Sequence, residues 1–344
     1  PHAADEICAA RIFKLIYNTL LVFDPKTGEI LPSLAEDYSQ ISEIEWTFSL
    51  RKGVYFHNGE ELTARDAVAS LRRVKNSERV KSQLAPVKEI IETGKYTLKI
   101  VLSEPYSPLP YKLCLTGCSI LSENAVTEGE TSNTFLPVGT GSYRFIDWST
   151  GDRVILERFD QCFNGTSPTK RLIFRSIPDD DERLRALESG AVDVAEWLPF
   201  SQYSRVIENP QLKLIQIPSV SVAHIALNVT KPPLDSKQVR QAIACAIDKQ
   251  TLIRQNLGGN GMVADSVFGP GIPGYTDVSQ NLIYDPGRAQ ALLAVAGYPE
   301  GFSLEALVVG STFDFCADLL TENLADVGIS LEIRRLDSAT YFQA

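Results

Sequence analysis

Residues 44–71 read IEWTFSLRKGVYFHNGEELTARDAVASL and contain the clearest structural pattern in the chain. Apolar and polar residues alternate from Ile44 to Arg51, which is the two-residue period of a strand with one buried face. Gly53 then interrupts the run, and Gly59 tolerates the positive φ of a tight turn. The stretch therefore predicts two short strands that turn at glycines, the second of them at residues 54–56.

A helix is predicted directly after this turn. Thr63 and Asp66 have the spacing of a capping box, in which Asp replaces the longer Glu. Apolar residues then recur at helical spacing, so one apolar stripe should pack inward. These residues are Ala64, Ala67, Val68, Leu71 and Val74.

The composition of the 344-residue chain is that of a globular protein. It is 44% hydrophobic and 22% charged, and no apolar run approaches the roughly 18 residues that a membrane span needs. The length favours about two domains, at roughly 150 residues each. A formal net charge of -10 repels phosphate backbones and anionic lipid, so we expect neither nucleic acid nor a membrane surface as a partner.

The six cysteines form no Cys-x-x-Cys pair and no cluster at zinc spacing. We therefore expect no metal site, no cofactor and no disulfide scaffold. Cys114 and Cys118 are the closest pair, and a disulfide between them stays open. The others lie in apolar contexts typical of buried thiols, and they are Cys8, Cys162, Cys245 and Cys316.

Several motifs resemble those of the family 5 extracellular solute-binding proteins, the peptide and nickel receptors of bacterial ABC importers. Most of the matching residues are structural, so they identify the scaffold rather than the ligand. They are Leu34-Ala35-Glu36, Leu50-Arg51, Gly53-Val54, Phe56-His57, Leu62-Thr63-Ala64, the run from Pro137 to Gly141, the run from Lys231 to Ala242, and Tyr284-Asp285-Pro286.

This resemblance implies an α/β, two-lobed fold like that of periplasmic binding proteins, with an extra small subdomain in the first lobe. We expect residues 1–22 and 137–235 to form the first lobe and residues 23–136 the subdomain. Residues 236–344 should form a partial second lobe. Family members extend beyond both ends of the matched part, so we expect a truncated chain that binds any ligand more weakly than the full one.

Further strands are predicted at residues 191–195, 212–217 and 223–229. Gly139 and Gly141 are expected to serve a turn. A phosphate-binding loop would need a third glycine, or Gly-Lys-Ser/Thr before a helix, and the sequence has neither there.

We find no catalytic motif in the sequence. There is no Gly-x-Ser-x-Gly elbow, no His-Glu-x-x-His and no P-loop, and the three histidines lie on different predicted elements. We therefore expect a receptor rather than an enzyme. Two alternatives stay open, namely a ligand-sensing module of a regulator and a hydrolase assembled from distant residues.

The resemblance implies capture of a small peptide between two lobes, whose closure is then recognised by ABC permease subunits in the membrane. It further implies a monomer in the periplasm or at the extracellular surface, with a lipid anchor if the host is Gram-positive. Peptide length and sequence preference cannot be inferred from these residues.

Similar nickel receptors carry a Tyr and a Met where ungapped matching places Ala4 and Ala9, and an Arg near Gly117. We therefore favour a peptide over a nickel chelate, although residues 261–270 resemble the corresponding nickel-receptor segment. Other small solutes, such as a sugar or an opine, stay as alternatives.

Five residues are nominated for the ligand cleft: Asp5, Glu6, Ile7, Trp197 and His224. The choice is positional, because in similar receptors the loop after Pro-His lines the cleft and an aromatic residue often occupies the place of His224. Each residue also has a structural interpretation. An exposed carboxylate is usually only solvated, Trp197 could belong to the core, and a lone His is more often structural.

Overall fold

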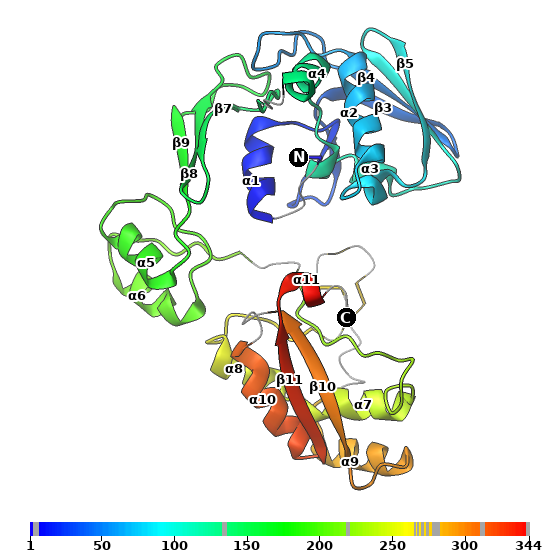
Figure 1. Ribbon diagram of the computed structural model, residues 1–344, viewed down its shortest axis with the longest axis vertical. Coiled ribbons are helices and arrows are strands. Elements are labelled where there is room, and N and C mark those ends of the chain that lie inside the picture. The colour runs from blue at the N-terminus through cyan, green and yellow to red at the C-terminus, as the bar shows by residue number, and fades with distance from the viewer. Residues whose placement is uncertain are drawn as a thin grey trace. The chain divides into compact units, whose positions relative to one another are not determined.

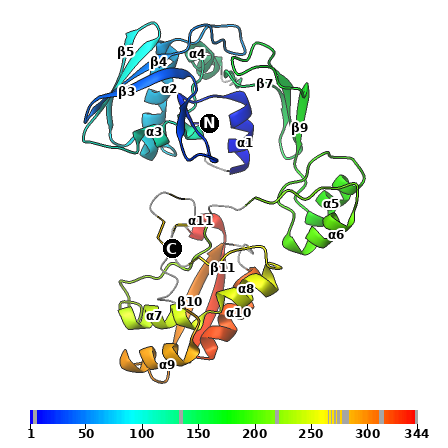
Figure 2. The same ribbon diagram turned by 180° about the vertical axis from the view of Figure 1, so that it is seen from behind.

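The structure is a computed structural model, and it forms two compact units, residues 1–177 and 178–344. Figures 1 and 2 show the chain from two opposite sides. The predicted boundary of the first lobe at residue 235 stays a prediction. The residues described are 1–2, 7–132, 136–217, 221–264, 266, 268–269, 272, 275–276, 283–309 and 314–341.

A four-stranded antiparallel sheet in the order β3-β4-β6-β5 lies at the centre of the predicted subdomain. Its alternation is as predicted, because Trp46, Phe48 and Leu50 are buried while their neighbours in β4 are partly exposed. Helix α2 packs on this buried face, as both views show (Figures 1 and 2). The elements are β3 (Ala35–Ser42), β4 (Glu45–Leu50), α2 (Ala64–Asn76), β5 (Val87–Gly94) and β6 (Thr97–Leu102).

Short elements complete this part of the chain. The strand predicted at residues 54–56 is reduced to one bridge between Tyr55 and Glu61, which is too short to form a ladder. Strands β1 and β2 form a separate antiparallel hairpin. The remaining elements are β1 (Leu21–Phe23), β2 (Ile30–Pro32), η1 (Lys81–Leu84), α3 (Leu109–Lys112), η2 (Thr116–Cys118) and α4 (Glu123–Ser132).

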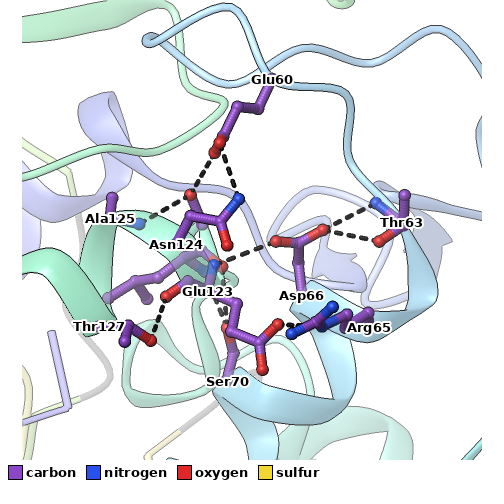
Figure 3. Close-up of polar contacts among 11 residues, drawn as sticks. Glu60, Thr63, Arg65, Asp66, Ser70, Glu123, Asn124, Ala125 and Thr127 are labelled. Carbon is purple, nitrogen blue, oxygen red and sulfur yellow. Dashed lines mark hydrogen bonds and ion pairs between the residues drawn. The ribbon is translucent and has the colours of Figure 1, made fainter.

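One carboxylate joins the starts of α2 and α4 (Figure 3). Asp66 accepts a hydrogen bond from the backbone N–H of Thr63 at 3.0 Å, which confirms the predicted capping interaction, and a second from the N–H of Glu123 at 3.0 Å. Two N–H groups that helix starts leave unpaired are thereby satisfied.

Glu60 provides a second polar link to α4 (Figure 3). Its carboxylate accepts hydrogen bonds from Asn124 and Ser122, both at 2.8 Å. The hydrogen bond from Asn124 is the main reason that the pKa of Glu60 is lowered. The turn around Gly59 is therefore tied to α4 by an ionised side chain.

A second antiparallel sheet, in the order β7-β8-β9, packs against helix α1. Their shared core contains Ile16 and Tyr17 from the end of the helix and Tyr143 and Leu156 from the sheet. The elements are α1 (Ile7–Ile16), β7 (Tyr143–Ser149), β8 (Arg153–Arg158) and β9 (Arg171–Arg175).

The two glycines that flank Thr140 pass directly over the end of α1. A Cβ at Gly139 would lie 2.1 Å from the carbonyl oxygen of Ile16, and one at Gly141 would lie 2.2 Å from that of Leu15. Gly141 also donates its N–H to the Ile16 carbonyl at 2.9 Å. The chain bends at residues 140–142, and the two glycines serve close backbone approach there rather than a positive φ.

His57 fixes the same loop from the other side. Its Nδ1 accepts the N–H of Gly139 at 3.3 Å, so the proton is on Nε2, which donates to the Gly141 carbonyl at 3.0 Å. The ring lies edge-on to Phe159. Burial lowers the pKa of His57 to about 4, so the imidazole is neutral near pH 7.

The second unit contains a pair of parallel strands, β10 and β11, that share a core with α7, α9 and α10. The elements of the unit are α5 (Asp180–Glu188), η3 (Phe200–Gln202), α6 (Tyr203–Glu208), α7 (Lys237–Ala246), α8 (Lys249–Asn256), α9 (Pro286–Val295), β10 (Phe302–Val309), α10 (Asp314–Ala325), β11 (Ile329–Leu336) and α11 (Ser338–Tyr341).

The strands predicted at residues 191–195, 212–217 and 223–229 are wrong. The structure has these segments as irregular chain, and apolar side chains along them are exposed, including Val194 and Ile217 at 76% and 79%. A strand requires a neighbouring backbone to complete its hydrogen-bond ladder. The apolar pattern of these segments indicates a preference for extended backbone. It does not indicate whether a second strand lies alongside to pair with them.

The described cysteines are free thiols, so the disulfide left open between Cys114 and Cys118 is not formed. Cys114 donates to the Pro110 carbonyl at 3.3 Å, and Cys118 contacts Oε1 of Gln83 at 3.5 Å. Burial raises the pKa of Cys114 to about 11 and that of Cys118 to about 12, which keeps both protonated. Within the described ranges, no helix has the length and apolar character needed to cross a bilayer.

Candidate functional site

All five nominations for the ligand cleft stay predictions, and the structure describes the side chains of only two of the residues, Trp197 and His224. Asp5 and Glu6 lie outside the described residues. Ile7 is the first residue of α1, and only its backbone is described. The nomination of the loop after Pro-His is therefore not tested by the structure.

Trp197 is exposed and has an unusual backbone. Its φ is 60°, and it is the only residue other than glycine with a positive φ in the part of the chain that the structure describes. Bulky L residues rarely adopt this left-handed conformation. The side chain is 65% exposed, so the interpretation of Trp197 as a core residue is wrong.

Arg183 of α5 holds this backbone. Its Nη2 donates to the carbonyl oxygen of Trp197 at 2.7 Å, and the same guanidinium pairs with the Asp180 carboxylate and donates to the Pro178 carbonyl. The Arg183 side chain is only 16% exposed. A guanidinium with several partners in one plane is fixed in direction, so the carbonyl of Trp197 is fixed as well.

Side-chain contacts hold the two ends of the segment that contains Trp197, which runs from α5 to α6. Arg205 donates to both carboxylate oxygens of Glu188, at 2.6 and 2.5 Å. Gln202 donates to Asp181 at 2.8 Å, and Leu184 of α5 and Val206 of α6 are both buried. The segment that bears Trp197 connects these two helices, so both of its ends are anchored.

The surroundings of Trp197 in the sequence are acidic. Between residues 179 and 196 there are seven acidic residues and two arginines, Arg183 and Arg185. Asp179 is the N-cap of α5 and accepts the N–H of Glu182 at 2.7 Å, and acidic side chains at a helix start favour the positive end of the helix dipole. Asp193 and Glu196, on the connecting segment, are exposed.

His224 lies in the extended segment that follows residue 220, and its side chain is exposed. Its Nδ1 is 3.4 Å from the Val222 carbonyl, a contact within the segment. The imidazole is therefore available to solvent rather than part of a core. That Trp197 and His224 line one pocket stays a prediction.

The sequence interpretation missed Arg183. A basic side chain that interrupts an acidic run in the first turns of a helix is a weak signal, because most such residues are solvated. Its role depends on the carbonyl of Trp197, which lies 14 residues further along the chain. No local pattern reports such a contact.

Known proteins with a similar fold are binding proteins for small solutes. One is the periplasmic binding protein DppA from Helicobacter pylori in complex with the peptide STSA, with a TM-score of 0.80 at 25% identity. The alignment covers 99% of this chain and 71% of DppA. The class is therefore the periplasmic binding proteins, and the predicted α/β fold class is confirmed.

Sequence comparison narrows this class to one family. The model of bacterial extracellular solute-binding proteins, family 5 Middle, matches residues 29–344, and the chain belongs to this family, as predicted. The glutathione-binding protein GsiB of Pectobacterium atrosepticum is 31% identical over 98% of this chain. The dipeptide-binding protein of Escherichia coli K12 is 28% identical over 95% of it. The chain spans 67% of the length of each of these relatives.

Proposed function

We propose that the chain is the solute-binding receptor of an ABC importer and that it captures a small peptide. Membership of family 5 carries this proposal, since family members are solute-binding receptors. Two relatives that match nearly the whole chain are named for glutathione, which is a tripeptide, and for dipeptides. A small peptide is the ligand class that these two names share.

The mechanism is binding rather than chemistry. A peptide would be held by a few placed polar groups in a site that excludes water, and ABC permease subunits would recognise the ligand-bound receptor. Trp197 and His224 are the described residues that we assign to ligand contact, and Asp5, Glu6 and Ile7 are assigned with them by position. The receptor would act as a monomer outside the cytoplasmic membrane, with a lipid anchor in a Gram-positive host.

Mass spectrometry of ligands that co-purify with the protein tests this proposal. Native spectra should show an added mass that disappears after the protein is unfolded and refolded, and fragmentation should identify it as a di- or tripeptide. Calorimetry on the refolded protein with Ala-Ala and with glutathione should then show saturable binding by at least one of them. A nickel chelate, a sugar or an opine as the co-purified ligand, with no peptide, would overturn the proposal.

A further inference from the structure

Trp197 combines two features that folding alone does not favour. The indole is 65% exposed, so it forgoes the large apolar burial that a Trp side chain can provide. Its backbone also has φ 60°, which a glycine would adopt without strain. Strained backbone at an exposed aromatic residue is typical of sites that present a side chain to a ligand.

The contacts of Arg183 explain how this conformation persists. Its guanidinium donates to the Trp197 carbonyl at 2.7 Å and to the Pro178 carbonyl at 3.4 Å, and it pairs with Asp180. Pro178 precedes α5 in the sequence, Asp180 is its first residue, and Trp197 follows it. The guanidinium therefore links the start of α5 to the segment after it. By holding the Trp197 carbonyl, it restrains the backbone conformation of Trp197.

The charge of this region indicates what the indole would contact. Acidic residues outnumber basic ones between residues 179 and 196, and Asp193 and Glu196 are exposed beside Trp197 in the sequence. The face of an indole attracts cations, and nearby carboxylates strengthen that preference. An anionic ligand group would be repelled here.

We propose that Arg183 is a positioning residue that holds the Trp197 indole at the surface as a platform for a cationic side chain of the bound peptide. This inference rests on the proposed function. Arg183 itself is not assigned a contact with the ligand, because its side chain is only 16% exposed and its Nη1 and Nη2 groups bond to Pro178, Asp180 and Trp197. It acts through the backbone of Trp197.

Two dipeptides that differ only in charge at one side chain test the platform. Calorimetry on the full chain would compare Lys-Ala with norleucyl-alanine, whose side chain has similar apolar length and no ammonium group. We expect the wild type to bind Lys-Ala about 10-fold more tightly, within the range of a partly desolvated cation–π contact. Trp197→Ala should abolish this preference while it still binds both dipeptides.

Variants on helix α5 test the role of Arg183. Arg183→Met should lose most of the preference for Lys-Ala, and Arg183→Lys should restore it only in part, because an ammonium group cannot reproduce the planar fork. Arg185→Met is the matched control, since Arg185 is 62% exposed on the same helix and its nearest carboxylate contact is 4.0 Å. This control should keep the wild-type preference.

A spectroscopic measurement separates positioning from loss of fold. In protein labelled with 5-fluorotryptophan, the three tryptophans give three ¹⁹F resonances, which Trp148→Phe and Trp197→Phe assign. Arg183→Met should shift or broaden the Trp197 resonance and leave those of Trp46 and Trp148 in place. Addition of Lys-Ala to the wild type should move the Trp197 resonance.

The outcomes are distinguishable. If the wild type binds both dipeptides equally, or if Trp197→Ala keeps the preference for Lys-Ala, the platform is wrong and the receptor function stands. If Arg183→Met keeps both the preference and the Trp197 resonance, the positioning role is wrong. If neither these dipeptides nor the co-purification experiment shows a peptide, the proposed function fails and this inference fails with it.

Discussion

The backbone of Trp197 has φ 60°, and the side chain of His57 is half-buried with both ring nitrogens hydrogen-bonded. Each of these residues is fixed by atoms distant in the sequence, Trp197 by Arg183 and His57 by the loop at Gly139. At the residue scale, therefore, the informative features are backbone conformation and protonation state. Two predictions follow from them.

Replacement of Trp197 by glycine should stabilise the fold relative to replacement by alanine. Both variants lose the exposed indole, and only glycine adopts φ 60° without steric strain. We expect Trp197→Gly to be about 0.5–1 kcal/mol more stable than Trp197→Ala in urea unfolding. Equal midpoints for the two variants would show that the backbone at this position is not strained.

The stability of the protein should fall as the pH is lowered from about 6.5 to about 4. The pKa of His57 is lowered to about 4 in the folded state, so in this window the unfolded chain binds more protons than the native one. The stability that neutral His57 contributes is complete above pH 6.5 and is lost as the pH falls toward 4. The loss is on the order of 2–3 kcal/mol.

Urea unfolding at several pH values checks this dependence. His57→Gln should show a shallower fall in stability between pH 6.5 and 4 than the wild type, because glutamine does not titrate. Part of the slope should persist, since burial also lowers the pKa of His2 to about 4. His224→Gln, at an exposed position, is the matched control. A parallel fall for wild type and His57→Gln would contradict the assignment.

At the scale of elements, the first unit is joined by contacts between helix ends and loops. The end of α1 meets the loop of Gly139 and Gly141 at backbone distance, and the starts of α2 and α4 share the Asp66 carboxylate. The close approach at the two glycines leaves no space for larger side chains, and the Asp66 carboxylate is the acceptor for two part-buried N–H groups. Substitutions there should therefore be far more damaging than similar changes on exposed helices.

Gly141→Ala should destabilise the protein by about 2 kcal/mol or more, because the new methyl group would overlap the Leu15 carbonyl, 2.2 Å away, and backbone cannot move aside as a side chain can. Gly287→Ala in α9 is the control. Its Cβ would meet only Asp285 Oδ1 at 3.5 Å, and alanine favours the helix, so its stability should equal or exceed that of the wild type. Thermal unfolding of the two variants gives the comparison.

Asp66→Ala should cost about 1–3 kcal/mol, since it removes the acceptor for two backbone N–H groups at once. Arg65→Ala, which removes the ion pair of a 70% exposed side chain with Glu123, should change the stability by less than about 0.5 kcal/mol. If chemical denaturation gave similar losses for both variants, the shared carboxylate would not be the link between α2 and α4.

At the scale of the whole molecule, the chain contains separate cores. Residues 1–177 hold one core under the four-stranded sheet and another beneath β7 and β8, whereas the core of α7, α9 and α10 belongs to the second unit. A core that closes within one unit can form without the other. The fragment 1–177 should therefore fold by itself.

Expression of residues 1–177 alone tests this expectation. Its circular dichroism should show mixed helix and strand, and heating should give one cooperative transition, as for small single domains. A core variant of the same fragment, Phe48→Ala, is the destabilised comparison. It should lose about 3 kcal/mol or more of stability, because Phe48 is 1% exposed. A wild-type fragment without a cooperative transition would contradict the independence of the unit.

Residue patterns along the chain were sufficient to predict the family, the α/β fold class and several elements. The alternation around Trp46 and the cap at Asp66 each depend on residues near one another in the chain, so local patterns predict them. Only the tertiary structure decided that residues 212–217 form no ladder, that Gly141 packs against α1, and that Arg183 holds Trp197. Each of these features depends on a segment that is distant in the sequence and adjacent in space. The residue types at one position do not indicate which segment that is.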